Sequence, residues 1–238
     1  MSLEEIVKKK RAEIIFLYAP VLKKLIELIE EEIKEIEKEL KVNRFVAKIE
    51  NKDTPQMQIK SPTSIIDKIK RSKYTIENAF CEFSDIFRDR IICNYLSDAK
   101  KINQRLKESE KITQQFEIVE KKDTIYEKRM KRPTKVKGVR AYYLVFKSKE
   151  KPECPKIEIQ IMTMLAWAWD KKDHYLIYEP EREKRKVSPV GKIKMNAMSE
   201  LLYVADEFFD ILQREIKEGK RSATEAQSSQ RIRKISHK

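Results

Sequence analysis

The sequence has few of the residue types on which many enzyme classes depend. Among 238 residues there are three glycines, two histidines (His174 and His237) and three cysteines (Cys81, Cys93 and Cys154). So few histidines argue against a histidine-rich metal hydrolase site, and no CxxC pair indicates a disulfide framework or a zinc site. The glycine-rich phosphate motifs GxxxxGK[ST] and GxGxxG are also missing. If the chain binds phosphates, side-chain cations and Mg²⁺ must hold them.

Long apolar runs are missing too. None approaches the roughly 20 residues that a membrane-spanning helix needs, and the N-terminal MSLEEIVKKK lacks the apolar centre of a signal peptide. We therefore expect no membrane association and a cytoplasmic location.

Charge, in contrast, is abundant and unbalanced. The chain has 53 Lys and Arg residues against 39 Asp and Glu residues, which gives a net charge of +14. This excess suggests an anionic partner such as a nucleotide, a nucleic acid or an anionic surface. A Lys/Glu-rich surface without a binding role is the alternative.

Apolar periodicity predicts helical segments at both ends of the chain. Residues 1–43 are expected to form N-terminal helices divided by Pro20, and residues 191–218 a C-terminal helix packed on the domain. Between them, strands mixed with helices predict a domain over residues 44–190, and residues 219–238 are expected to be a disordered basic tail. This order of elements predicts an α+β fold, a mixed sheet of about five strands flanked by helices, with helical extensions at both ends.

Two acidic residues occur where strands are expected to be apolar. Asp85 opens DIFRDRII and Glu158 interrupts KIEIQI, and Arg90 lies in the same strand as Asp85. Two carboxylates that face the same way on neighbouring strands offer the hard oxygen ligands that Mg²⁺ shares with substrate phosphates. Each acid alone could be a solvent-facing edge residue. Their occurrence together with nearby cations favours a metal site.

One face of a predicted helix carries the cations. Ser61 followed by proline is a typical helix start, and SPTSIIDKIKR continues with helical spacing. Ser64, Lys68 and Arg71 recur at intervals of four and three residues, so they share a face. Lys60 immediately precedes the helix. The segment therefore presents a hydroxyl group and several positive charges to one side.

A basic loop forms the third notable segment. Residues 121–140 contain nine basic and two acidic residues. Gly138 lies between this loop and the next predicted strand, where a turn or a close approach of backbone to ligand is expected. A solvated hairpin tip is the alternative.

Taken in order, these segments resemble the synthetase domain of the RelA/SpoT family, which makes the alarmone (p)ppGpp. Four motifs between Lys60 and Tyr178 carry the resemblance: QIKSPTSIIDK, the Asp and Arg of DIFRDR, RPTKVKGVRAYY, and EIQIMTMLAWAWDKKDH. The matching residues are Lys60, Ser64, Ile65, Lys68, Asp85, Arg90, Pro133, Lys137, Gly138, Glu158, Gln160, Thr163 and His174.

The resemblance implies a nucleotidyltransferase-like sheet, Mg²⁺ as cofactor, and transfer of the β,γ-pyrophosphate of ATP to the 3′-hydroxyl of GDP or GTP. Asp85 and Glu158 would be catalytic and hold the metal ion, and Glu158 could also orient or deprotonate the attacking hydroxyl group. The ATP-binding residues would be Lys60, Ser64, Lys68, Arg71 and Arg90. The acceptor-binding residues would be Lys137, Gly138, Arg140, Tyr143, Gln160 and His174.

The sequence departs from the family pattern mainly on the acceptor side. Val139 stands where the family has a tyrosine that stacks on guanine, and Met162 and Gln58 each replace an arginine. A tRNA 3′ end, the acceptor of toxin-like members, therefore stays an alternative that the basic charge suits. A non-catalytic nucleic-acid-binding relative is a third. The protein partners left open are a second copy of the chain, packed through the terminal helices, and an antitoxin.

Overall fold

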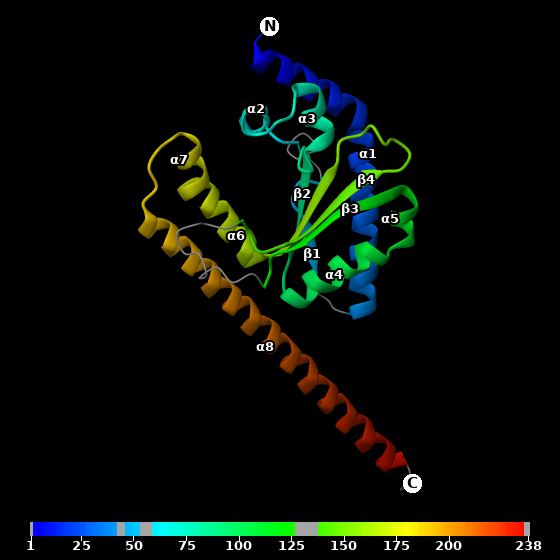
Figure 1. The fold of residues 1–238 in the computed structure, drawn as a ribbon. Helices are drawn as coiled ribbons and strands as arrows, with labels where there is room; N and C mark the ends of the chain where they lie inside the picture. Colours follow the sequence, from blue (N-terminus) through cyan, green and yellow to red (C-terminus); the bar gives the residue numbers. More distant parts are fainter. Residues whose placement is uncertain (1, 42–45, 53–58, 127–137, 236–238) are drawn as a thin grey trace.

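A five-stranded mixed sheet forms the centre of the computed structural model (Figure 1). The structure describes residues 2–41, 46–52, 59–126 and 138–235. The strands are β1 (Ala47–Ile49), β2 (Phe87–Cys93), β3 (Phe116–Asp123), β4 (Tyr142–Ser148) and β5 (Ile157–Thr163). Their spatial order is β1-β2-β5-β4-β3, with β2 and β5 parallel and the other neighbours antiparallel. The predicted α+β fold is confirmed.

The last strand in sequence, β5, lies in the middle of the sheet. Its alternate residues Ile157, Ile159 and Ile161 are buried in the main hydrophobic core. Met162, whose side chain points to the opposite face, belongs to a separate small cluster. Successive side chains of EIQIMT thus face opposite sides of the sheet, and Glu158 lies on the side away from the main core.

Helices cover both faces of the sheet. On the side of the main core lie α1 (Leu3–Leu40), α4 (Leu96–Glu108) and α5 (Glu110–Gln115), and on the other side lie α6 (Met164–Asp173) and α8 (Pro189–Ile235) (Figure 1). The shorter helices are α2 (Pro62–Arg71), α3 (Ile76–Glu82), a π-helical turn η2 (His174–Tyr178) and α7 (Glu179–Arg182).

The N-terminal segment is one helix, and the predicted division at Pro20 is wrong. Helix α1 runs from Leu3 to Leu40 with Pro20 inside it. A proline removes one backbone hydrogen bond, but buried side chains on both sides of it, such as Ile14 and Leu22, anchor the two halves to the same core. Packing therefore keeps the helix continuous where the local sequence favours a break.

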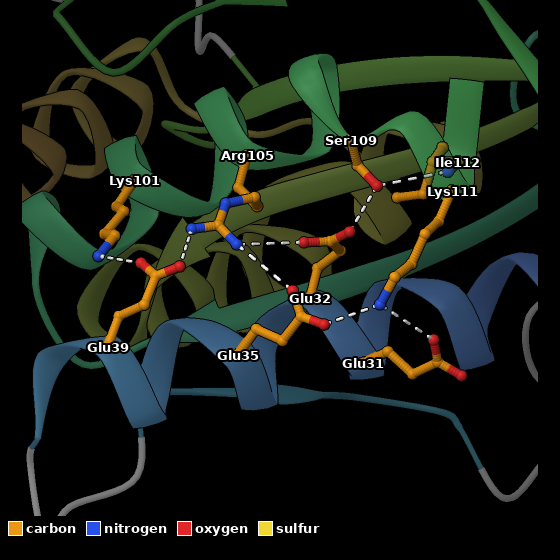
Figure 2. A network of polar contacts seen from close by, with 9 residues as sticks. All are labelled: Glu31, Glu32, Glu35, Glu39, Lys101, Arg105, Ser109, Lys111 and Ile112. Carbon is orange, nitrogen blue, oxygen red and sulfur yellow. Dashed lines mark hydrogen bonds and ion pairs between the residues drawn. The ribbon is translucent and has the colours of Figure 1, made fainter. Parts of the chain in front are cut away.

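A polar network fastens α1 to α4 and α5 (Figure 2). Glu32 on α1 is buried, accepts a hydrogen bond from the hydroxyl group of Ser109, and lies 3.4 Å from the guanidinium of Arg105. Arg105 also pairs with Glu39, whose carboxylate accepts a 3.0 Å bond from Lys101. The network fixes the position of α1 along the sheet.

The start of α4 is tied to α8. The helix begins at Leu96, and the N-cap residue Tyr95 makes no side-chain capping bond. Ser97 donates hydrogen bonds from its backbone amide and its hydroxyl group to Asp210 of α8. A serine two residues into a helix is free to serve a tertiary contact.

Helix α8 continues beyond the point at which the sequence predicts disorder. It extends through Ile235, and its C-terminal half projects away from the sheet (Figure 1). After Gly219 the segment lacks proline and contains several Lys, Arg, Gln and Ala residues, which favour a helix even without an apolar stripe. No helix in the described part of the chain has both the length and the apolar character needed to cross a membrane.

Candidate active site

Asp85 lies in the turn that leads into β2 and accepts bonds from two lysines. The Nζ atom of Lys68 is 2.6 Å from its Oδ1, and Lys60 contacts its Oδ2. The backbone amide of Lys60 donates a 3.0 Å bond to the carbonyl of Ile86, which ties the start of α2 to the start of β2. The structure therefore joins two segments that the sequence predicts separately, the cationic helix and the acidic strand.

The two lysines decide the charge of Asp85. Burial alone would raise the pKa of this carboxyl group, but the positive charges of Lys60 and Lys68 outweigh burial and lower it. Asp85 is therefore ionised at neutral pH. Its negative charge also holds both ammonium groups together at one point.

Glu158 lies opposite Arg88 in the parallel β2–β5 pair. Burial and the negative charge of Asp85 raise its pKa, against the effect of a 2.7 Å hydrogen bond from the Nε2 atom of Gln160. Two carboxyl groups that influence each other thus have pKa values shifted in opposite directions. Such pairs are typical of sites in which one acid stays charged and the other exchanges a proton.

The guanidinium group of Arg90, on β2, contacts three acceptor side chains. Its guanidinium lies 2.8 Å from Glu50, 2.8 Å from Asp170 and 3.2 Å from the side-chain oxygen of Gln160. Burial opposes ionisation of Glu50, but hydrogen bonds from Lys171, Arg90 and the indole of Trp167 lower its pKa to about 2. Arg90 therefore positions Gln160, which in turn contacts Glu158.

A cleft of about 500 Å³ opens beside these residues. It is lined by Ile59, Lys60, Ser61, Ser64, Asp85, Arg88, Arg90, Gly138, Asp170, Asp173, His174 and Tyr178. Six of the residues singled out from sequence are in this lining, drawn from both the donor and the acceptor sets. The volume is in the range of small-molecule sites, which is roughly 300–1,000 Å³.

The remaining predicted site residues lie elsewhere. Arg71 faces an adjoining cleft, and its Nε donates a 3.0 Å bond to the carbonyl of Asp67 in its own helix. Arg140 is buried against α8, where it lies 2.8 Å from Glu200. The structure therefore shows Arg140, two residues before β4, in contact with α8, and its role at the acceptor stays a prediction. Lys137 lies outside the described residues.

Of the predicted acceptor residues Tyr143 and His174, only His174 lines the cleft. The hydroxyl group of Tyr143 donates a 3.2 Å bond to the carbonyl of Val139, and the described lining of the cleft does not include its ring. His174 does line the cleft, and its ring centroid lies 5.2 Å from that of Tyr178. His174 and Tyr178 are the first and last residues of the π-helical turn η2, a local distortion that is frequent at functional sites.

The two departures from the family pattern on the acceptor side meet in space. Val139 and Met162 are both buried in the small cluster with Trp169. Where the sequence comparison expects a stacking ring and an arginine, this protein has one continuous apolar contact under α6 and α8. Val139 and Met162 therefore pack in one cluster, in place of the tyrosine and the arginine that the family has at these positions.

Asp85 and Glu158 fit a Mg²⁺ ion that arrives with its own ligands. No group of three or more His, Cys, Asp or Glu side chains suited to a metal ion occurs among the described residues. Mg²⁺ often takes only one or two protein carboxylates and completes its coordination with water and substrate phosphates. Two carboxylates suit a metal ion whose coordination is shared with substrate better than a site formed by the protein alone.

Residues 57–183 match the family described as the region found in RelA / SpoT proteins, which is more than half of the chain. The chain belongs to the RelA/SpoT family. No curated protein matches it. The family match includes every residue that lines the cleft.

Solved structures resemble this RelA/SpoT protein over most of its length. Small alarmone synthetase 1 from Bacillus subtilis, bound to its product pppGpp, has a TM-score of 0.61 at 20% identity, covering 84% of this chain and 96% of that chain. Small alarmone synthetase 2 from the same organism has a TM-score of 0.59 at 23% identity, covering 83% and 96%. A GTP pyrophosphokinase family protein from Streptococcus pneumoniae has a TM-score of 0.60 at 18% identity, covering 85% and 95%. These likenesses show a shared fold.

Sequence reasoning misses several residues of this RelA/SpoT site. Glu50 and Asp170 both pair with Arg90, and Asp173 and Tyr178 line the cleft. A signal for three of them is present, because Asp170, Asp173 and Tyr178 recur with His174 at helical spacing and so share a face. Glu50 follows a three-residue strand and has no comparable local signal.

Proposed function

We propose that the chain is an ATP-dependent pyrophosphokinase that transfers the β,γ-pyrophosphate of ATP to the 3′-hydroxyl of GDP or GTP, giving a (p)ppGpp-type alarmone. The observation that carries this proposal is the contact of Asp85 with Lys60 and Lys68 at a cleft that Lys60 and Asp85 line, together with a Glu158 carboxyl group whose pKa the charge of Asp85 helps to raise. The family supports it, and so do relatives solved with pppGpp and with AMPCPP.

Lys60 and Lys68 are suited to bind the donor phosphates. Both ammonium groups are already directed to one point by Asp85, so little side-chain freedom remains to be lost when phosphates bind. Ser61 and Ser64, whose hydroxyl oxygens are 2.9 Å apart, add hydrogen-bonding groups at the same helix start. Mg²⁺ held by Asp85 and Glu158 would supply further neutralisation of phosphate charge.

Glu158 is suited to take the proton of the acceptor. The oxygen of the 3′-hydroxyl attacks the β-phosphorus, its proton passes to the Glu158 carboxylate, the bond from the β-phosphorus to the α,β-bridging oxygen breaks, and AMP leaves. A raised pKa makes Glu158 a stronger proton acceptor than an ordinary glutamate. Gln160 and Arg90 hold it in place through successive hydrogen bonds.

Mass analysis of products tests the reaction. ATP is offered with GDP, GTP, adenine nucleotides or tRNA in separate incubations, and AMP together with a 3′-pyrophosphorylated guanine nucleotide is expected. Asp85→Ala and Glu158→Gln should each lower turnover at least a hundredfold, within the roughly 10²–10⁴ typical of such groups. Glu117→Gln, at an exposed position on β3, is the control and should retain activity. Full turnover in both site variants would refute the assignment.

A tRNA 3′ end is the second candidate acceptor. The observation that favours it is Val139, which is buried and offers no aromatic ring for a guanine. The net charge of +14 also suits a polynucleotide. In the same assay, label on tRNA and none on guanine nucleotides would select this candidate, and no transfer to any acceptor would favour a non-catalytic relative.

The exposed apolar side chains of α8 favour a second copy of the chain as the protein partner. Large apolar side chains there are exposed, for example Leu201 at 64% and Phe208 at 61%. The inner face instead carries buried polar residues such as Asn196 and Ser199. Because an exposed apolar stripe of this size is unusual for a monomer, a second copy of the chain is the expected occupant, with an antitoxin as the alternative.

A further inference from the structure

Arg88 is a cation of the active-site cleft to which no role has yet been given. The lysines and arginines in the described lining of the cleft are Lys60, Arg88 and Arg90. Arg88 lies on β2, three residues after Asp85, and its side chain is half-buried. It is therefore placed within the candidate active site and not on the open surface around it.

Carboxylates already neutralise the other two cations of the lining. Lys60 pairs with Asp85, and the guanidinium of Arg90 lies 2.8 Å from each of two carboxylates. Within the described part of the chain, by contrast, the guanidinium of Arg88 makes no ion pair and no hydrogen bond. Because an arginine side chain stays protonated in proteins, Arg88 brings to the cleft a positive charge that no described carboxylate contacts.

The register of the sheet places Arg88 beside Glu158. The two residues are opposite each other in the parallel β2–β5 pair, and neighbouring strands lie about 4.7–4.9 Å apart. Both side chains are on the face away from the main core, since the adjacent residues Phe87 and Ile157 are buried in that core. The side chains are close enough to interact, because the positive charge of Arg88 counteracts part of the rise that burial causes in the pKa of Glu158.

The proposed reaction puts the transferred group at the same point. The acceptor hydroxyl must be within hydrogen-bond reach of Glu158 to pass its proton to that residue. Before it attacks, its oxygen must also lie roughly 3–3.5 Å from the β-phosphorus of ATP. The β-phosphoryl group therefore lies next to Glu158, within reach of a long side chain on the neighbouring strand.

The chemistry of the guanidinium group suits this position. Phosphoryl transfer spreads negative charge over the non-bridging oxygens of the moving group, and arginine offers a planar fork of N–H donors that matches two such oxygens. Lys60 and Arg90 would each have to give up an ion pair to turn toward a phosphoryl group. Among the lysines and arginines of the described lining, Arg88 can do so without that loss.

We propose that Arg88 is a further catalytic residue, which donates hydrogen bonds to the non-bridging oxygens of the β-phosphoryl group as that group passes from ATP to the acceptor. This inference rests on the proposed function and adds a residue to it. Arg88 forms and breaks no covalent bond. The proton of the acceptor still passes to Glu158, and AMP still leaves with the α,β-bridging oxygen.

Steady-state kinetics with ATP and the acceptor that product analysis identifies test the proposal. Arg88→Ala should lower kcat at least a hundredfold, yet raise the KM for ATP no more than about fivefold, because the contact strengthens as charge develops. Arg88→Lys keeps the charge but not the fork, so it should recover roughly tenfold of the loss in kcat. The control, Lys48→Ala, removes an exposed lysine of β1 outside the described lining and should change neither quantity.

Titration calorimetry with AMPCPP and with AMP separates a phosphoryl contact from a general effect on the fold. AMPCPP carries the β- and γ-phosphates that AMP lacks. Arg88→Ala should bind AMPCPP about fivefold more weakly, since it loses a charge-assisted contact, but should bind AMP as the unmodified chain does. A side chain that only supported the sheet would weaken the binding of both ligands alike. Equal thermal unfolding of Arg88→Ala and Lys48→Ala checks that both variants are folded.

Three results would overturn the role of Arg88: unchanged kcat in Arg88→Ala, equal losses in Arg88→Ala and Lys48→Ala, or equal weakening of AMPCPP and AMP binding. The proposed function would stand in each case if the unmodified chain makes the alarmone. A chain that makes no product, but whose Arg88→Ala variant selectively loses affinity for AMPCPP, would refute the proposed function and support the contact of Arg88 with the phosphates. Absence of AMPCPP binding by the unmodified chain would overturn both.

Discussion

Asp85 and Glu158 influence each other's charge, yet their surroundings shift their pKa values in opposite directions. Lysines lower the pKa of Asp85, whereas burial and the charge of Asp85 raise that of Glu158. The division follows from position, because the Lys60–α2 segment reaches Asp85, whereas Glu158 receives a hydrogen bond from the neutral amide of Gln160. Opposite shifts of this kind are typical of carboxyl pairs in which one acid stays charged and the other exchanges a proton, which is the division of roles that we propose.

Gln160→Ala should move the pH dependence of the reaction. Glu158 must be ionised to accept a proton, so activity is lost as pH falls through its raised pKa. The amide of Gln160 lowers that pKa, and its removal should shift the acidic limb of the kcat/KM profile to higher pH. The control is Gln104→Ala, which removes a similar 3.0 Å glutamine–glutamate bond on α4. An unshifted limb in Gln160→Ala would contradict the role given to Glu158.

Glu50→Gln should remove stability that depends on pH. Because the pKa of Glu50 is lowered to about 2, its ion pairs stabilise the fold above the usual pKa of glutamate and lose that effect as pH falls toward 2. The contribution at neutral pH should be up to about 3 kcal/mol. Urea unfolding near neutral pH and at about pH 3 measures it, and the difference between variant and wild type should shrink in acid.

Glu4→Gln is the control for that experiment. It removes an exposed pair with Lys8 within one helix and should alter stability little at either pH. A constant difference between Glu50→Gln and wild type across pH would mean that Glu50 acts through packing and not through its charge.

At the level of residues, much of the site could be predicted from the sequence. The residues that hold Arg90 in place, Glu50 and Asp170, could not. Motif spacing identifies Lys60, Lys68, Asp85 and Glu158, and the structure brings the two lysines to Asp85. Their functional roles stay predictions. Spacing cannot tell which way a side chain points at the end of a loop, so Arg140 is assigned to the acceptor although it packs on α8.

At the level of elements, the contact between α1 and α4 depends on one buried acid. Glu32 is 4% exposed and relies on Arg105 and Ser109 for its hydrogen bonds (Figure 2). Helices joined in this way cannot slide past each other without leaving a buried charge unpaired.

Arg105→Met should therefore destabilise the fold by about 2 kcal/mol, since it leaves Glu32 buried with only Ser109 as a partner. Lys101→Met removes only an exposed contact with Glu39 and should cost less than about 0.5 kcal/mol. Chemical denaturation of the two variants measures the contrast. Equal losses would show that the network is no stronger than ordinary surface pairs.

Element boundaries are where sequence patterns fail in this protein. Pro20 predicts a break and Gly219 an end, yet α1 and α8 pass through both. Local propensities of this kind amount to a few kcal/mol at most, so buried contacts or a run of helix-forming residues override them. The strands were more predictable, because their alternation is fixed by a core on one side of the sheet.

At the level of the whole molecule, α8 carries more than half of the large hydrophobic residues that are exposed in the described part of the chain. Besides Leu201 and Phe208 it presents Val204, Ile211, Leu212 and Ile216 at helical spacing. Several polar residues of the helix, Asn196, Ser199, Asp206 and Gln213, are buried instead, which departs from the usual pattern of a surface helix.

Leu201→Asp/Phe208→Asp should lower the mass of the particle measured by light scattering, from an oligomer to a single chain. The charges would be buried without partners if two α8 faces met. Val119→Asp changes an exposed apolar residue on β3, away from α8, and it should leave the mass unchanged. A wild-type chain that is already a monomer would reject self-association and leave an antitoxin-type partner as the occupant.

The central place of β5 has a consequence for how the protein is made. The chain first emerges from the ribosome with β1 and β2, and later with β3 and β4, as two half-sheets. Small paired units of this kind are marginally stable alone, and each keeps an open edge until residues 157–163 are synthesised. Nascent chains should therefore need protection by chaperones until then. A translation product that stops before β5 loses Glu158 and the link between the half-sheets together, so no partly active fragment arises.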